Sequence, residues 1–251
     1  MASSSNKMLI IFTLNILLYM YCGVYVEAAV VCKNNNPPEI VGVIEKGDFS
    51  KLVVCLQDFV DNGMPISTKE GGHILKPIGW VYFNSKGGDV NEAIKIGRFL
   101  RESLADVVVN EQCSSACFLA VVGAVKIYAG GGVFGDIGIH RVFYDEAALK
   151  HTNMSEYEAT YNEIKKGARQ YCYDMDVPTA LVEKMFAISS RDLYILKYTE
   201  IEQLGKHPAF DEWIESRCSV NLKEPDRVKC VDNVRWAQFK ETVKKYYKKY
   251  R

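Results

Sequence analysis

Hydrophobic residues in the first half of the chain alternate between two spacings, one typical of strands and one typical of helices. Ile40–Ile44 is a mostly β-branched run that fits a strand, and residues 48–60 place apolar side chains on one face of a helix. The two patterns then repeat. Residues 79–83 fit a buried strand, residues 84–88 a tight turn, and Asp89 an N-cap that opens an amphipathic helix. This repetition predicts strand–helix–strand units.

The second half of the chain continues the alternation. The segment after Ser115 is apolar nearly all round, which indicates a helix buried at the centre of the protein. Strands separated by helices of this length predict an α/β fold whose mainly parallel sheet is covered on both faces. Further strands are expected at 107–109, 125–128 and 138–143, and further helices at 155–174, at 178–186 and from Asn233 onward.

The N-terminal segment has the features of a targeting sequence. Lys7 precedes a nearly continuous apolar run, and Val26-Glu27-Ala28 has the small-residue spacing of a signal-peptidase site. We therefore expect a signal peptide at 1–28, a folded domain at 29–205 and a C-terminal extension at 206–251. The alternative is an uncleaved membrane anchor, because the apolar run approaches spanning length. In either case the folded part is expected to be exported, periplasmic or secreted.

Export changes the interpretation of the cysteines, since disulfides persist in oxidising compartments. Seven of the eight cysteines follow the predicted signal peptide, so one thiol stays free or pairs with another chain. A metal site is not expected, because the CxxxC pair has no second pair at the spacing that zinc needs. The pairs expected are Cys218–Cys230 and Cys32–Cys55; Cys113 and Cys117 could bridge each other, or Cys172 could take one of them.

Charge and composition exclude several kinds of partner. Lys plus Arg and Asp plus Glu number 31 each, so the chain has no overall field to attract nucleic acid. No nucleotide-binding motif is found, and no cofactor is expected. Residues 244–251 interleave basic side chains with tyrosines, which could associate weakly with an anionic membrane surface or simply form the solvated end of a helix.

Two short motifs carry the candidate chemistry. Gly87 and Gly88 fall between a predicted strand and a predicted helix, where backbone amides without a neighbouring side chain can point at a ligand. Ser115 lies in a run of small residues at the start of the next helix, where the macrodipole and free amides favour developing negative charge. A hydroxyl beside an amide cradle suits acyl transfer.

These motifs resemble those of the Clp protease proteolytic subunit. The turn NSKGGDV is similar to the family's glycine turn, CSSAC places Ser115 where the family has its nucleophile, and Ile139-His140 is similar to its base motif. Ser190-Arg191-Asp192 resembles the segment that carries the third triad residue, and the whole resemblance covers roughly 42–205. It implies a ClpP/crotonase-like spiral fold and a Ser115, His140 and Asp192 triad. It also implies an oxyanion hole from Gly87, Gly88 and the helix start at Ala116.

The resemblance implies an exported serine peptidase that hydrolyses peptides or unfolded segments without an ATP-driven unfoldase. It also implies a possible homo-oligomer, with the helix at 155–174 in the place of the family's ring-contact handle. Two departures from the family pattern are Lys86, where the family has proline, and the cysteines beside the nucleophile. Alternative functions are a catalytically inactive relative that binds a partner, and a crotonase-type acyl-CoA enzyme.

Alternative site residues also remain open from the sequence. Ser114 is the second choice for the nucleophile, because it adjoins Ser115 in the same small-residue run. Asp174 and Asp176 are alternatives for the third triad residue. A serine–lysine dyad would instead use Lys126 or Lys150.

Overall fold

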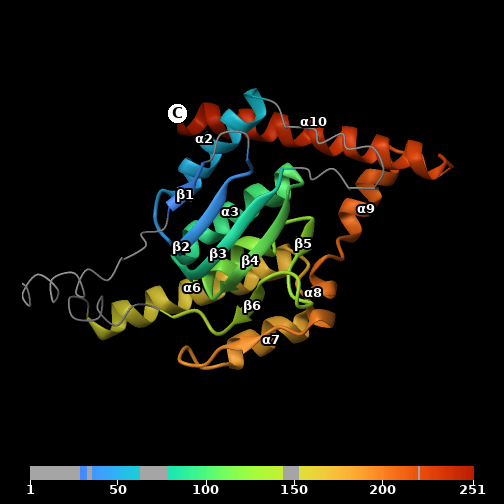
Figure 1. Cartoon of the computed structure of the whole chain (residues 1–251). Helices are drawn as coiled ribbons and strands as arrows, with labels where there is room; N and C mark the ends of the chain where they lie inside the picture. Colours follow the sequence, from blue (N-terminus) through green and yellow to red (C-terminus); the bar gives the residue numbers. More distant parts are fainter. Residues whose placement is uncertain (1–28, 33–35, 63–78, 144–152, 220) are drawn as a thin grey trace, which may run out of the picture.

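The computed structural model describes residues 29–32, 36–62, 79–143, 153–219 and 221–251, and it has an α/β fold (Figure 1). Its seven strands form one sheet in the order β1-β2-β3-β4-β6-β7, with β5 also paired to β4. All pairings are parallel except those of the edge strands β1 and β7. The prediction of a mainly parallel sheet is confirmed. The strands are β1 (Ala29–Val31), β2 (Glu39–Ile44), β3 (Val81–Gly88), β4 (Asp106–Ser114), β5 (Lys126–Tyr128), β6 (Asp136–Ile139) and β7 (Tyr194–Ile195).

The helices connect and cover these strands. In Figure 1, α2 and α10 run side by side along one end of the sheet, and α6 and α7 lie toward the other end. In the described part of the chain, no helix is both long and apolar enough to cross a membrane. The expected signal peptide at 1–28 lies outside the described residues. The helices are α2 (Asp48–Asp61), α3 (Val90–Ser103), α4 (Ala116–Val121), α6 (Met154–Asp174), α7 (Thr179–Ala187), α8 (Tyr198–Leu204), α9 (Pro208–Glu215) and α10 (Glu224–Tyr250).

Two strands extend further than the hydrophobic pattern predicts. The expected turn at 84–88 is wrong, because β3 continues through these residues and pairs Gly88 with Ile44 of β2. The positive φ angles of the two glycines, 104° and 142°, let the strand bend there without ending. Likewise β4 continues from the predicted 107–109 as far as Ser114. Both candidate motifs therefore lie at the carboxyl end of a strand, on neighbouring strands.

The helix after Ser115 is central, as its apolar sequence predicts. Every residue of α4 is buried, and α4 packs against β3, β4 and α3. The α3–α4 contact depends on two glycines, since a Cβ on Gly123 would lie 1.9 Å from the carbonyl oxygen of Gly97. The backbones therefore approach closely, and α4 has little freedom to shift.

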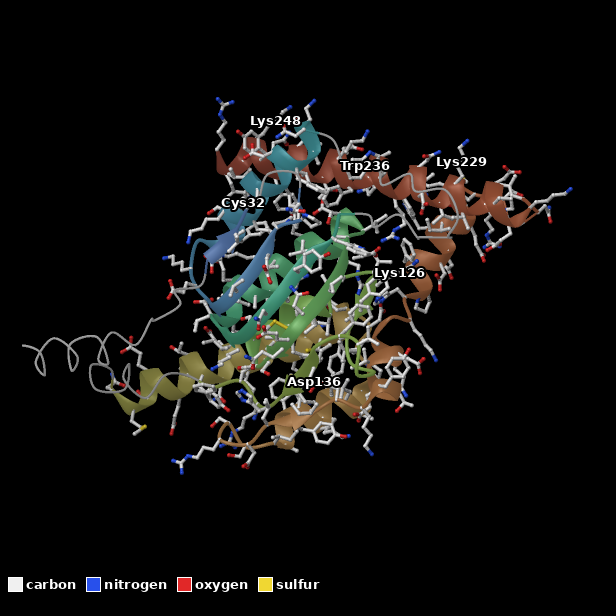
Figure 2. All side chains as sticks on the ribbon, viewed as in Figure 1. Cys32, Lys126, Asp136, Lys229, Trp236 and Lys248 are labelled. Atoms are coloured by element: carbon white, nitrogen blue, oxygen red, sulfur yellow. A yellow bond between two sulfur atoms is a disulfide. The ribbon has the colours of Figure 1, made fainter. Side chains whose placement is uncertain are left out.

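The C-terminal extension is built into the same core. Its helix α10 begins at Glu224, earlier than the predicted Asn233, and lies across α2 and α3. Phe239 is fully buried and its ring occupies the space that a side chain at Gly79 would need. The buried Arg235 donates hydrogen bonds to the Leu104 carbonyl and to the Asp106 carboxylate. The extension is thus part of the domain's packing, while Lys229 and Lys248 lie exposed toward the two ends of α10 (Figure 2).

Candidate active site

Ser115 occupies a strained turn between the end of β4 and the start of α4. Its φ and ψ angles are 59° and −126°, outside the regions that a residue with a side chain normally adopts. Such a conformation costs on the order of 1–3 kcal/mol and persists only where the surroundings enforce it. The Ser115 amide donates to the Gly138 carbonyl at 3.0 Å, and the Ser115 carbonyl accepts from Phe118 at 3.0 Å. A serine on a strained strand-to-helix turn has the geometry of an exposed nucleophile.

The structure distinguishes the two adjacent serines. Ser114 is the last residue of β4 and is buried, with its hydroxyl oxygen 2.8 Å from the position that a Cβ on Gly138 would occupy. Ser115 is at the apex of the turn and is half-buried. Of the two serines, Ser115 is therefore the more accessible to solvent.

The glycine turn at the end of β3 lies directly against Ser115. A Cβ on Gly87 would lie 2.7 Å from the Ser115 Cβ and 2.9 Å from the Ala116 amide nitrogen. Only glycine leaves room for the nucleophile here. The end of β3 and the turn at Ser115 are therefore in direct contact.

The three amides expected as oxyanion donors, those of Gly87, Gly88 and Ala116, have different surroundings in the structure. The Gly87 amide donates to the Ser85 hydroxyl at 3.1 Å, so it already has an acceptor. The Asp89 amide donates to Ile44 of β2 at 2.8 Å. Ala116 is the first residue of α4, so its amide has no acceptor within the helix. The roles of Gly87, Gly88 and Ala116 as oxyanion donors stay predictions.

His140 follows the end of β6, which lies beside β4. The parallel register pairs Ser114 with Gly138, so His140 emerges at the same end of the sheet as Ser115. Its ring is half-buried, and Nδ1 lies 2.9 Å from the Arg141 carbonyl oxygen. Because a carbonyl only accepts, Nδ1 carries the proton in the neutral ring and Nε2 is left as a proton acceptor. This is the tautomer that a general base for a serine needs.

Asp192 is brought near His140 by backbone pairing alone. It lies two residues before β7, whose antiparallel pairing places Tyr194 beside Ile139. The Asp192 side chain is exposed, and among the described residues no hydrogen bond joins it to His140. Its role as the third triad residue stays a prediction.

The alternative aspartates lie elsewhere and have other partners. Asp174 pairs with Arg98 at 3.0 Å, and Asp176 pairs with Arg101 at 3.0 Å and with His207 at 3.4 Å. Both lie at the C-terminal end of α6, and neither contacts His140. Both carboxylates therefore have partners other than His140 in this arrangement.

The alternative lysine base is also misplaced. Lys126 begins β5 beside Asp106, at the opposite end of β4 from Ser115, whereas Asp136 begins β6 beside Gln112 (Figure 2). Eight residues of strand correspond to about 25 Å, far beyond the reach of a lysine. The second alternative, Lys150, lies outside the described residues.

A cleft of about 590 Å³ opens beside the glycine turn. One wall is Gly88 with the first turns of α3, and the opposite wall is the middle of α6. Phe143 also lines it, and its ring centroid lies 5.6 Å from that of His140. Ser115 and His140 do not line the cleft, so it lies beside the candidate residues and meets them at Gly88 and Phe143. The other lining residues are Asp89, Val90, Asn91, Ile94, Thr160, Glu163, Ile164, Gly167 and Ala168.

The two expected cysteine pairs, Cys32–Cys55 and Cys218–Cys230, are disulfide-bonded. Of the alternatives left open, Cys113 is bonded to Cys117 and not to Cys172. Cys172 is the free thiol among the described residues, and burial raises its pKa to about 12, so it is an inert core side chain. Within the described ranges, no group of three or more His, Cys, Asp or Glu side chains is arranged to hold a metal ion.

Comparison with known proteins gives a distant likeness in structure. No protein-family model and no curated protein matches the chain. Among solved structures, the chain is similar to a point mutant of ClpP1 from Listeria monocytogenes, with 14% identity and a TM-score of 0.41 over 66% of this chain and 85% of that one. Likeness at this level gives no information on chemistry, which depends on the residues described above.

Proposed function

We propose that the chain is an exported serine peptidase with a ClpP/crotonase-like spiral fold, which acts on peptides or unfolded segments without an ATP-driven partner. The observation that carries this proposal is the strained Ser115, held against a glycine turn at the carboxyl end of neighbouring strands. Backbone strain of this kind clusters at active sites and ligand-binding segments. The three disulfides support export, because they are stable in oxidising compartments.

The chemistry follows from the roles of these groups. His140 Nε2 accepts the hydroxyl proton of Ser115 as the oxygen attacks a substrate carbonyl. The Gly88 and Ala116 amides then donate to the oxyanion of the tetrahedral intermediate. Histidine returns the proton to the leaving amine, and water releases the acyl group by the same steps. The cleft beside Gly88 holds the peptide, with Asp192 near the imidazolium that forms.

A fluorophosphonate probe tests this proposal, because it reacts covalently with activated serines. The folded protein is expected to label at one site, mapped by mass spectrometry to Ser115. Ser115→Ala is expected to abolish labelling, and Ser114→Ala is the matched control that should keep it. An unlabelled wild-type protein with a native circular dichroism spectrum would reject the peptidase.

A second candidate is a catalytically inactive relative that binds peptides in the same cleft. The observation that favours it is the missing hydrogen bond between His140 and Asp192 among the described residues. Fluorescence anisotropy with a labelled peptide library distinguishes the two candidates. An inactive binder would retain its peptides uncleaved, whereas a peptidase would release fragments that disappear in Ser115→Ala.

A further inference from the structure

The strained turn at Ser115 is closed by a covalent bond. Cys113, in the last residues of β4, is bonded to Cys117, in the first turn of α4, with their Cα atoms 5.2 Å apart. Both cysteines are fully buried. The bridge therefore encloses Ser115 in a ring of five residues, the shortest loop that any of the three disulfides closes.

The two ends of this ring are fixed in different ways. Cys113 is held on both sides by the sheet, where it pairs with Ser85 of β3 and Ile137 of β6. Cys117 belongs to α4, which has only six residues and is too short to be stable by its own backbone bonds. The close packing of α4 on α3 lies at Leu119, Ala120 and Gly123, in the second half of the helix and beyond it. The first turn of α4 is thus the part able to move if Ser115 relaxes to an ordinary backbone conformation.

We propose that the Cys113–Cys117 disulfide is a positioning device that holds the backbone of Ser115 in its strained conformation. The proposal rests on the proposed function, since the strained conformation contributes to activity only if Ser115 is a nucleophile. A consequence is redox dependence. Two electrons and two protons from a dithiol reductant convert the bridge to two thiols, the reductant becomes a disulfide, and Ser115 is no longer clamped.

The chain offers matched controls for this proposal. Cys218–Cys230 joins the residues after α9 to α10, and Cys32–Cys55 joins the segment after β1 to α2. Neither bridge contacts the strand ends that carry Ser115 and the glycine turn. Loss of either is expected to lower stability without a specific effect on the serine.

The test compares Cys113→Ala/Cys117→Ala with Cys218→Ala/Cys230→Ala in the full chain. The rate of fluorophosphonate labelling is expected to fall about ten-fold or more in the first variant and to match wild type in the second, whatever their melting temperatures. Wild-type protein purified in dithiothreitol, with thiols counted by mass spectrometry, should label as slowly as the first variant. If the Cys113→Ala/Cys117→Ala variant does not fold, the reduced wild-type protein tests the proposal in its place. The proposal would be overturned if the Cys113→Ala/Cys117→Ala variant and the reduced wild-type protein both label at the rate of the oxidised wild-type protein.

A second measurement separates this proposal from the peptidase itself. The Ser115 amide donates to the Gly138 carbonyl, so its hydrogen exchange reports whether the turn is held. Reduction is expected to speed exchange at Ser115 about ten-fold or more, and to leave exchange in the centre of β3 unchanged. If the oxidised protein never labels but this exchange rises, the peptidase fails and the clamp stands. Unchanged exchange overturns the clamp.

Discussion

The two halves of the candidate site are held to different degrees. The nucleophile half consists of Ser115 and the glycine turn, and each part is fixed by strand pairing, a disulfide or close backbone packing. The base half consists of His140, which follows the short strand β6, and Asp192, which precedes the short edge strand β7. Their side chains are not hydrogen-bonded to each other among the described residues.

This difference indicates where the site depends on rigidity. Oxyanion donors must be in place before charge develops, because their advantage is that they need no reorganisation. A base needs only the correct tautomer and access to the hydroxyl. The Arg141 carbonyl oxygen lies 2.9 Å from Nδ1 of His140 and so favours the tautomer with a proton on Nδ1. In other triads a buried carboxylate has this role. The backbone thus replaces part of the expected role of Asp192.

The largest effect is expected from His140→Gln, which removes the base and keeps a similar shape. Loss of a general base lowers rates by about 10² to 10⁴-fold, and the labelling rate should fall within that range. Arg141→Ala is the matched control, because it keeps the backbone carbonyl that contacts Nδ1. A His140→Gln protein that labels as fast as the control would show that another group activates the serine.

The next effect tests the nucleophile half at Gly87. A Cβ there would lie 2.7 Å from both the Ser114 carbonyl oxygen and the Ser115 Cβ, so Gly87→Ala must displace the turn. Since displacing oxyanion donors costs about 10² to 10³-fold, labelling should fall to that extent.

Gly47→Ala is the matched control for the strain at Gly87. Gly47 has the same φ angle of 104°, but nothing lies within 4 Å of its Cβ position. The free energy of unfolding should fall by about 1–2 kcal/mol with the labelling rate unchanged. Labelling and urea denaturation are measured for both Gly87→Ala and Gly47→Ala. If labelling falls equally in the two variants, the cause is general destabilisation and not a displaced turn.

The sequence predicts the layers of this fold better than the ends of its strands. Hydrophobic spacing reports which side chains are buried, and the central helix after Ser115 followed directly from it. Spacing does not report that β3 continues through Gly88, because that depends on pairing with Ile44 of a distant strand. The early start of α10 had a local signal that spacing overlooks, namely Pro225 in the first turn after Lys223.

The sequence proposes candidate residues but does not predict their arrangement. The motif around Ser115 names the serine, yet nothing in the sequence encodes a φ angle of 59° there. The Gly87 amide is taken by the Ser85 hydroxyl, a contact between residues two apart that the glycine motif alone does not reveal. The Arg141 carbonyl that fixes His140 belongs to the backbone, and so it leaves no signal in the choice of side chain.

A smaller effect is expected from Asp192→Asn. Loss of the buried aspartate of an established triad lowers the rate by about 10⁴-fold, chiefly because the histidine takes the wrong tautomer. Here Asp192 is exposed and the Arg141 carbonyl fixes the tautomer, so labelling should fall by less than about ten-fold. A loss near 10⁴-fold, measured in the same labelling assay, would mean that the base half rearranges into a conventional triad.

The smallest effect on labelling is expected from Glu92→Gln, which changes a buried contact between α3 and the start of α2. Glu92 is 2% exposed on α3 and accepts hydrogen bonds from Gly47 and Phe49, both at 2.9 Å, and from Lys95 at 2.8 Å. Burial alone would raise the pKa of Glu92, but these hydrogen bonds outweigh it and hold the pKa below its ordinary value of 4.5.

The sign of the pH dependence follows from that lowered pKa. Ionised Glu92 stabilises the folded state fully when the pH is above the pKa that Glu92 has in the unfolded state. This stabilisation is lost as the pH falls through the lower pKa that Glu92 has in the folded state. Wild-type protein should therefore lose stability below about pH 4.5, and Glu92→Gln should lose less there. At neutral pH the variant should be less stable by about 1–3 kcal/mol in urea denaturation, with labelling within about two-fold of wild type. A large loss of labelling would place Glu92 in the nucleophile half itself, because it would mean that the glycine turn depends on this carboxylate for its position.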